Sequence, residues 1–125
     1  MLQKLLWIAL GGALGTLSRY GLTSATQRWL GPGFPWGTAV VNVIGCFLFG
    51  ALYAFAIGRW SLGTDARTVI FVGFIGAFTT FSTLVSETGQ FLSDSEMLMG
   101  MGNVVFQVVA GIGVFFLGLA VGKTI

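Results

Sequence analysis

The chain has 125 residues, of which 55% are hydrophobic and 8% are charged, and its formal net charge is +2. A soluble domain carries roughly 25% charged residues, so this chain lacks the polar surface that a soluble fold of its length needs. The composition therefore excludes a soluble domain, and six basic residues spread along such a chain do not indicate nucleic-acid binding.

Four apolar stretches follow one another along the chain, and each is near the ~20 residues that cross a hydrocarbon core. They cover about residues 5–20, 36–57, 68–92 and 97–121. The connectors between them are short and cover residues 31–35, 59–67 and 93–96. We therefore predict an all-α membrane protein, a single domain over residues 1–125 with four transmembrane helices and with both termini on the same side.

The basic residues give a weak prediction of orientation. The side with both termini and the middle connector carries Lys4, Arg59, Arg67 and Lys123. The other side carries Arg28, together with Arg19 if that residue lies outside the membrane. Because positive residues tend to stay cytoplasmic, the small bias favours cytoplasmic termini and leaves both single and dual topology open.

The first two stretches each contain one informative polar residue. Arg19 lies four and eight residues after Gly15 and Gly11, a stripe of small residues that permits close helix packing. Its side chain either snorkels to the interface or is a buried structural or electrostatic group. Asn42, in the second stretch, offers amide donors and an acceptor oxygen. Its spacing favours an interhelical hydrogen bond, with a pore-lining donor as the alternative.

The third stretch contains a concentration of hydroxyl side chains directly after Gly73 and Gly76. These are Thr79, Thr80, Ser82 and Thr83. This pattern is unfavourable for an uninterrupted lipid-facing helix, so we predict a broken span whose backbone lines a cavity. Freed carbonyls there can hold a cation such as sodium, and the hydroxyls can donate to an anion; a kinked packing helix is the alternative. Glu87, further along, either pairs with a base or faces water.

The fourth stretch carries Asn103 and Gln107 on one face, and its Gly118 and Gly122 favour close helix packing. The chain has no histidine and a single cysteine, Cys46. Its carboxylates show no spacing typical of an acid/base pair or a metal site. We therefore do not expect an enzyme, and a transport protein or a structural subunit remains.

Three ordered motifs resemble the signatures of the Fluc (CrcB) family of fluoride channels. The first is Gly11-Gly12-Ala13-Leu14-Gly15 followed by Arg19-Tyr20, and the second is Trp36-Gly37-Thr38 followed by Val41-Asn42 and Gly45. The third and most specific is Gly73-Phe74-Ile75-Gly76-Ala77-Phe78-Thr79-Thr80-Phe81-Ser82-Thr83, with Glu87 after it. The resemblance extends over essentially the whole chain.

This resemblance implies a passive, fluoride-selective channel of the bacterial cell membrane that relieves fluoride toxicity. Members of the family that this chain resembles assemble as antiparallel homodimers with two pores. The implied partners are therefore fluoride, a second copy of the chain and the lipid bilayer. It also implies a structural sodium ion at the dimer centre, held here by the backbone carbonyls of Gly76 and Thr79.

The resemblance also implies a fluoride path, with two departures from the family. Leu84 stands where the family has a second phenylalanine, and Phe78 is a candidate to replace it; Gln107 stands where hydroxyl residues are common. The predicted path is lined by Asn42, Phe78, Phe81, Ser82, Thr83 and Gln107. Structural or electrostatic roles are predicted for Arg19, Thr80 and Glu87.

Two alternatives belong to other classes of membrane protein. A small dimeric multidrug exporter needs a glutamate in its first helix, whereas the first acidic residue of this chain is Asp65, in a connector. A membrane scaffold subunit would explain the small-residue faces and would leave the hydroxyl cluster unexplained.

Overall fold

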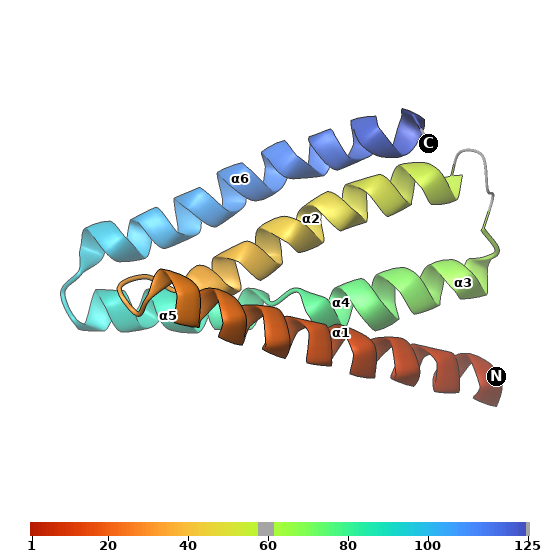
Figure 1. Cartoon of the computed structure of the whole chain (residues 1–125), viewed down its shortest axis with the longest axis horizontal. Coiled ribbons are helices and arrows are strands. Elements are labelled where there is room, and N and C mark those ends of the chain that lie inside the picture. The colour runs from red at the N-terminus through yellow and green to blue at the C-terminus, as the bar shows by residue number, and fades with distance from the viewer. Residues whose placement is uncertain (58–61, 125) are drawn as a thin grey trace.

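The computed structural model describes residues 1–57 and 62–124, and within them it contains helices and no strand. Three long helices are α1 (Leu2–Leu30), α2 (Trp36–Ile57) and α6 (Met97–Thr124). Between α2 and α6 lies the third helical run, which consists of α3 (Thr64–Thr68), the π-helix η1 (Val69–Ile75), α4 (Gly76–Phe78) and α5 (Phe81–Ser93). The runs lie along one long axis, and both termini lie at the same end of the molecule (Figure 1).

Three helical segments of the described chain are long and apolar enough to cross a membrane, namely Trp36–Ile57, Thr64–Ser93 and Met97–Thr124. Many of their exposed side chains are large and apolar, as lipid contact requires. The first helix is not among these candidates, so the count of four spans stays a prediction. α1 also continues well beyond the apolar stretch at residues 5–20, because its polar second half remains helical up to the turn at residues 31–35.

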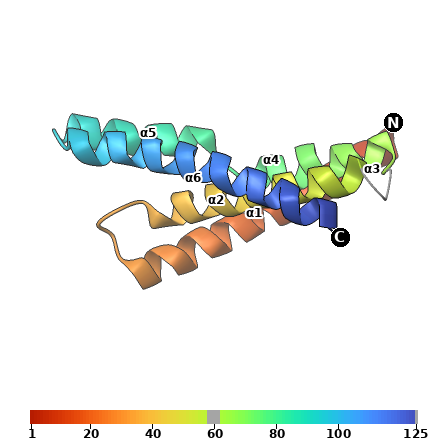
Figure 2. The same ribbon diagram turned by 90° about the horizontal axis from the view of Figure 1, so that it is seen from above.

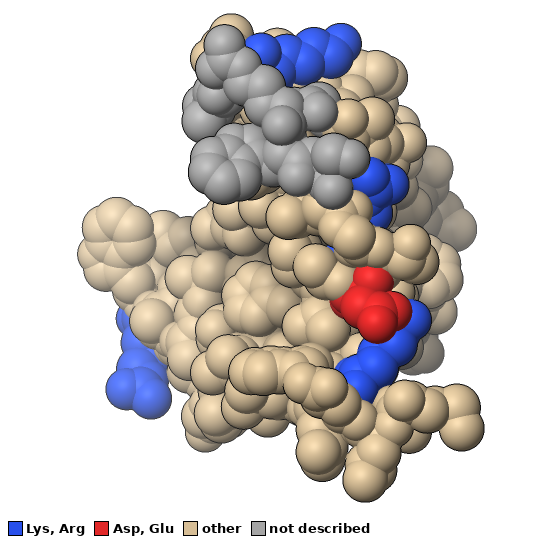
Figure 3. All heavy atoms as spheres, turned by 90° about the vertical axis from the view of Figure 1, so that its right-hand side faces the viewer, with Lys and Arg blue, Asp and Glu red and all other residues tan. Residues whose placement is uncertain are grey.

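The connector predicted at residues 59–67 is partly helical, since α3 already begins at Thr64. Arg59 lies outside the described residues. At this end of the molecule, basic side chains are scattered over a largely uncharged surface, with one acidic patch beside a basic one (Figure 3). The Nζ atom of Lys4 lies 2.8 Å from Oδ1 of Asp65, which ties the start of α1 to α3.

Glycines bring α2 and α6 into backbone contact. A Cβ atom added at Gly118 would meet the carbonyl oxygen of Phe47, and one added at Gly122 would meet that of Ala51. Gly50 on α2 faces α6 in the same way. The close packing predicted from Gly118 and Gly122 is therefore confirmed, and it fixes α6 along the length of α2.

The third helical run changes its neighbour halfway. Its upstream half, η1 and α4, packs on α1, where a Cβ atom at Gly15 would meet the carbonyl oxygen of Phe74 and one at Gly11 would lie 3.2 Å from that of Val69. Its downstream half, α5, packs on α6 instead. Figure 2 shows that α5 and α6 diverge from α1 and α2 at the end opposite the termini.

The helix is interrupted between α4 and α5. Thr79 has an extended backbone with ψ 159°, and Thr80 follows with φ −149° and ψ 112°. Thr80 then caps α5, because its side chain accepts from the backbone N–H of Thr83. The predicted break in the third span is confirmed. The π-helix before it was not predicted; such wide turns often occur at functional sites.

Candidate functional site

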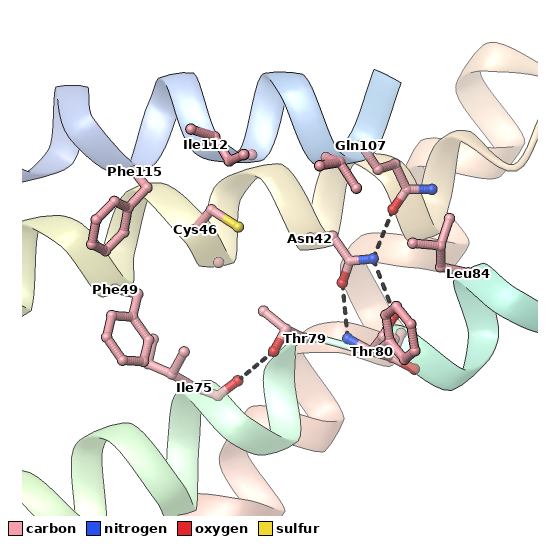
Figure 4. A pocket seen from close by; sticks show the side chains of 14 residues that line it. Asn42, Cys46, Phe49, Ile75, Thr79, Thr80, Leu84, Gln107, Ile112 and Phe115 are labelled. Carbon is pink, nitrogen blue, oxygen red and sulfur yellow. Dashed lines mark hydrogen bonds between the residues drawn. The ribbon is translucent and has the colours of Figure 1, made fainter. Parts of the chain in front are cut away.

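Asn42 closes the break from the neighbouring helix. Its Oδ1 accepts from the backbone N–H of Thr80 at 2.8 Å, and its Nδ2 donates to the carbonyl oxygen of the same residue at 3.1 Å. One amide thus pairs with both backbone groups of a residue that has left the helix (Figure 4). The interhelical hydrogen bond predicted for Asn42 is confirmed, and two of its bonds are to backbone groups.

The break also removes regular partners from two carbonyls. In a continuous helix, the N–H groups of Thr80 and Thr83 would donate to the carbonyls of Gly76 and Thr79. Here the Thr80 N–H donates to Asn42, and the Thr83 N–H donates to Oγ1 of Thr80 at 3.3 Å. Carbonyl oxygens released in this way are oxygen ligands of the kind that suits a hard cation such as sodium. The two carbonyls predicted as sodium ligands are therefore chemically suited to that role.

Arg19 stabilises the end of the upstream half. Its Nε donates to the carbonyl oxygen of Ala77 at 3.1 Å, and the side chain is only partly exposed. A cation at a helix C-terminus is favourable because the free carbonyls there carry partial negative charge. This contact supports the structural interpretation of Arg19 over the snorkelling one.

Three more polar side chains extend from Asn42 towards α5. The second proton of Asn42 Nδ2 is donated to Oε1 of Gln107 at 2.7 Å, and Nε2 of Gln107 donates to Oδ1 of Asn103 at 2.8 Å. Nδ2 of Asn103 then donates to Oγ1 of Thr88 at 3.1 Å. We call Asn42, Gln107, Asn103 and Thr88 the amide chain. Asn103 and Thr88 were not predicted as site residues, although the four-residue spacing of Asn103 and Gln107 placed both on one face.

A cavity of about 440 Å³ lies beside the break. Its polar end is formed by Asn42, Thr80 and Gln107, and its other end is apolar, with Phe49 and Phe115 (Figure 4). The remaining lining residues are Gly45, Cys46, Ile75, Thr79, Phe81, Leu84, Val108, Gly111 and Ile112.

Two rings of the predicted path lie in different places. Phe81 lines the cavity, yet it is 77% exposed, so the cavity opens towards the outside of the single chain. Phe78 is not among the lining residues. It is 4% exposed and stacks on Phe74 with ring centroids 5.9 Å apart. The ring of Phe78 lies in the interior between helices, while Leu84 faces the cavity, and the role of Phe78 in the path stays a prediction.

Ser82 and Thr83 lie in a hydroxyl cluster on the first turn of α5 and are not among the residues that line this cavity. Oγ1 of Thr80 lies 2.9 Å from Oγ1 of Thr83 and 3.4 Å from Oγ of Ser82. The two predicted path hydroxyls are thus brought to the break, on the capping side of Thr80. The structure gathers most of the predicted residues around one interruption, and Phe78 is not among those that line the cavity.

Glu87 lies in a second, more polar cavity of about 420 Å³ between the α1–α2 turn and the end of α5. Oε1 of Glu87 accepts from Oγ1 of Thr38 at 2.5 Å. Its Oε2 is buried and has no hydrogen-bond partner in the described part of the chain. The described lining residues of this cavity include no base, so Glu87 pairs with a hydroxyl from α2 instead.

Comparisons with known proteins agree on one family. Residues 6–119 match the family model described as CrcB-like protein, Camphor Resistance (CrcB). The chain is 50% identical over 125 residues to a protein of Solidesulfovibrio magneticus and 49% identical over 125 residues to one of Nitrosococcus oceani, with all of both chains covered in each case. A Salinibacter ruber protein is 46% identical over 116 residues, 92% of this chain and 86% of its own. All three are named fluoride-specific ion channel FluC.

Proposed function

The chain belongs to the CrcB-like protein family, and on that basis we propose that it is a channel that lets fluoride leave the cell passively and so relieves fluoride toxicity. It is a multi-pass membrane protein. The observation that supports the proposal most is the break at Thr79 and Thr80, which places polar groups beside a cavity inside an apolar bundle. The relatives named as fluoride-specific channels supply the identity of the ion.

Fluoride is difficult to move because removing its water costs tens of kcal/mol unless other donors replace that water. At the polar end of the cavity, Asn42 supplies an N–H that now binds the oxygen of Gln107. Fluoride takes this donor by replacing one acceptor with another, so no buried donor is left unpaired during the exchange. The ring edge of Phe81 adds a weak attraction for an anion, and Ser82 and Thr83 supply hydroxyls on the other side of the break.

Conduction also requires that the ion leave. A lysine or arginine in the path would hold fluoride too strongly, and the described residues that line the cavity include neither. Neutral amide and hydroxyl donors bind an anion more weakly than a fixed cation does. This donor set favours a channel over a tight anion-binding site.

The working unit that we propose is an antiparallel homodimer with two pores. One chain leaves Phe81 largely exposed at its cavity and provides two released carbonyls, at Gly76 and Thr79. A second copy related by a two-fold axis would cover the ring and double the carbonyl set. A sodium ion held by that set would make the centre electropositive without placing a binding cation in the path.

The proposal is tested by fluoride efflux. The purified protein is reconstituted in liposomes loaded with potassium fluoride, and release is followed with a fluoride electrode after valinomycin is added. We expect rapid efflux of fluoride and much slower efflux from matched liposomes loaded with chloride. Efflux no faster than from protein-free liposomes would overturn the proposal. Uptake of a cationic dye driven by a proton gradient would instead support a multidrug exporter.

A further inference from the structure

The break sets the direction of the hydrogen bonds at the Asn42 end of the amide chain. The two ends of a side-chain amide are hard to distinguish, but the backbone of Thr80 removes the ambiguity at Asn42. Its N–H must meet Oδ1 and its carbonyl must meet Nδ2. The remaining proton of Asn42 therefore points at an acceptor, which must be the oxygen of Gln107. The amide nitrogen of Gln107 then faces Asn103.

The far end of the amide chain has no such fixed direction. Asn103 is fully buried at 0% exposure, and its Nδ2 donates to the hydroxyl of Thr88. An amide can be turned end for end, and a hydroxyl can either accept or donate a hydrogen bond. The hydroxyl of Thr88 can therefore serve the chain in both directions, whereas an apolar side chain could serve it in neither.

We propose that the amide chain reverses when an anion reaches Asn42, which makes Asn103 and Thr88 positioning residues for fluoride. In the reversed state, Gln107 turns its N–H groups towards the anion beside Asn42, and its oxygen accepts from Asn103. Asn103 in turn accepts from the hydroxyl of Thr88. The Gln107–Asn103 and Asn103–Thr88 bonds are each replaced by one of opposite direction, and the Asn42–Gln107 bond is replaced by two N–H groups that both donate to the anion. The anion therefore gains a second donor at no loss of buried pairing. This inference rests on the proposed function.

The reversal explains why two buried amides lie in an apolar helix. The Gln107 side chain is 5% exposed, so a fixed oxygen there would face an incoming anion with the wrong charge. If the Gln107 amide turned with no partner behind it, its oxygen would be left without a hydrogen bond inside the bundle. Asn103, which does not line the cavity, supplies the missing partner.

The flux test uses variants at Thr88, the half-buried end of the amide chain. Thr88→Val keeps the shape and removes the hydroxyl, and we expect it to lower fluoride efflux about tenfold, as loss of one buried hydrogen bond predicts. Thr88→Ser keeps the hydroxyl and should retain efflux. Thr26→Val, which removes a buried hydroxyl from α1, is the control for a polar loss elsewhere. Efflux from Thr88→Val equal to the parent protein would overturn the inference.

A double-mutant comparison separates positioning from general stability. Gln107→Met removes the amide that turns, so Thr88→Val should lower efflux no further when it is combined with Gln107→Met. Reductions that multiply would show that Thr88 acts independently of Gln107 and would overturn the inference. Absence of efflux from the parent protein would instead overturn the proposed function, so the two failures are distinguishable.

A spectroscopic test does not depend on flux. The chain contains only two asparagines, Asn42 and Asn103, so selective ¹⁵N labelling of asparagine gives two side-chain amide signals, assigned with Asn103→Leu. Adding sodium fluoride should shift the Asn103 signal although that residue does not line the cavity, and sodium chloride should not. A fluoride-dependent shift at Asn42 alone would overturn the reversal.

Discussion

The two halves of the third helical run are held by different forces. The upstream half packs on α1 through glycines, so that backbone approaches backbone at Gly11 and Gly15. The downstream half packs on α6 and is tied to its neighbours by side chains, through Thr88 to α6 and Glu87 to α2. The break allows one segment to use both kinds of packing. The polar site forms at the junction between the two halves, where the glycine packing ends and the side-chain contacts begin.

The largest effect is expected at the junction itself. Asn42→Asp keeps an acceptor for the Thr80 N–H but loses both donated bonds, and it sets a carboxylate against two oxygens. Because each unpaired buried group costs about 1–3 kcal/mol and the new charge repels an anion, we expect fluoride efflux to fall about 100-fold or more. The rate of fluoride efflux from liposomes that contain the variant measures this loss.

Asn42→Leu provides the comparison, because it has similar size and no charge. It leaves both backbone groups of Thr80 without their partner, so we expect a loss of efflux close to that of Asn42→Asp. Normal efflux from Asn42→Leu would mean that the amide does not hold the junction and that repulsion alone explains the acidic variant.

The glycine contacts of the upstream half predict the next largest effect. In Gly15→Ala, the added methyl group meets the carbonyl oxygen of Phe74, so we expect the variant to be destabilised by about 1–3 kcal/mol. Gly21→Ala on the same helix is the matched control, because nothing lies within 4 Å of its added Cβ. Thermal unfolding of both variants in detergent measures the difference. Equal stability would contradict glycine packing as the force that holds this half.

The sequence predicts those parts of the structure that depend on local composition. Apolar length gave α2 its bounds, and the hydroxyl residues after Gly76 indicated the break. Hydropathy did not predict the end of α1, because the residues after the apolar stretch are more polar and still form helical backbone hydrogen bonds up to Leu30. There Gln27 donates to the carbonyls of Gly31 at 2.6 Å and Phe34 at 3.0 Å and so holds the turn in place.

The detail of the site depends on contacts distant in sequence. Asn42 meets the backbone of a residue 38 positions away, and no side-chain pattern indicates a backbone partner. Phe78 stacks on Phe74, a contact that the path implied by the family resemblance does not include. The wide turns of η1 likewise lie where α1 approaches through Gly11, a contact between segments distant in sequence.

Replacing sodium tests whether the released carbonyls of two copies of the chain together bind a sodium ion. Purification with N-methyl-D-glucamine as the only cation should lower efflux several-fold and shift the protein from dimer towards monomer in size-exclusion chromatography. Restoring sodium should reverse both changes, and restoring potassium at equal ionic strength is the control. Unchanged efflux and elution without sodium would contradict a structural sodium site at Gly76 and Thr79.

The smallest effect is expected where the downstream half meets the cavity. Leu84 is 5% exposed and lines the cavity, so Leu84→Phe places a second ring near Phe81. Ring contacts are worth about 0.5–1.5 kcal/mol, and we therefore expect the ratio of fluoride to chloride efflux to rise about threefold. Leu84→Met, which conserves volume, controls for altered packing and should leave the ratio unchanged. An equal change in both variants would assign the effect to packing, and then the downstream half would contribute to the path through its shape alone.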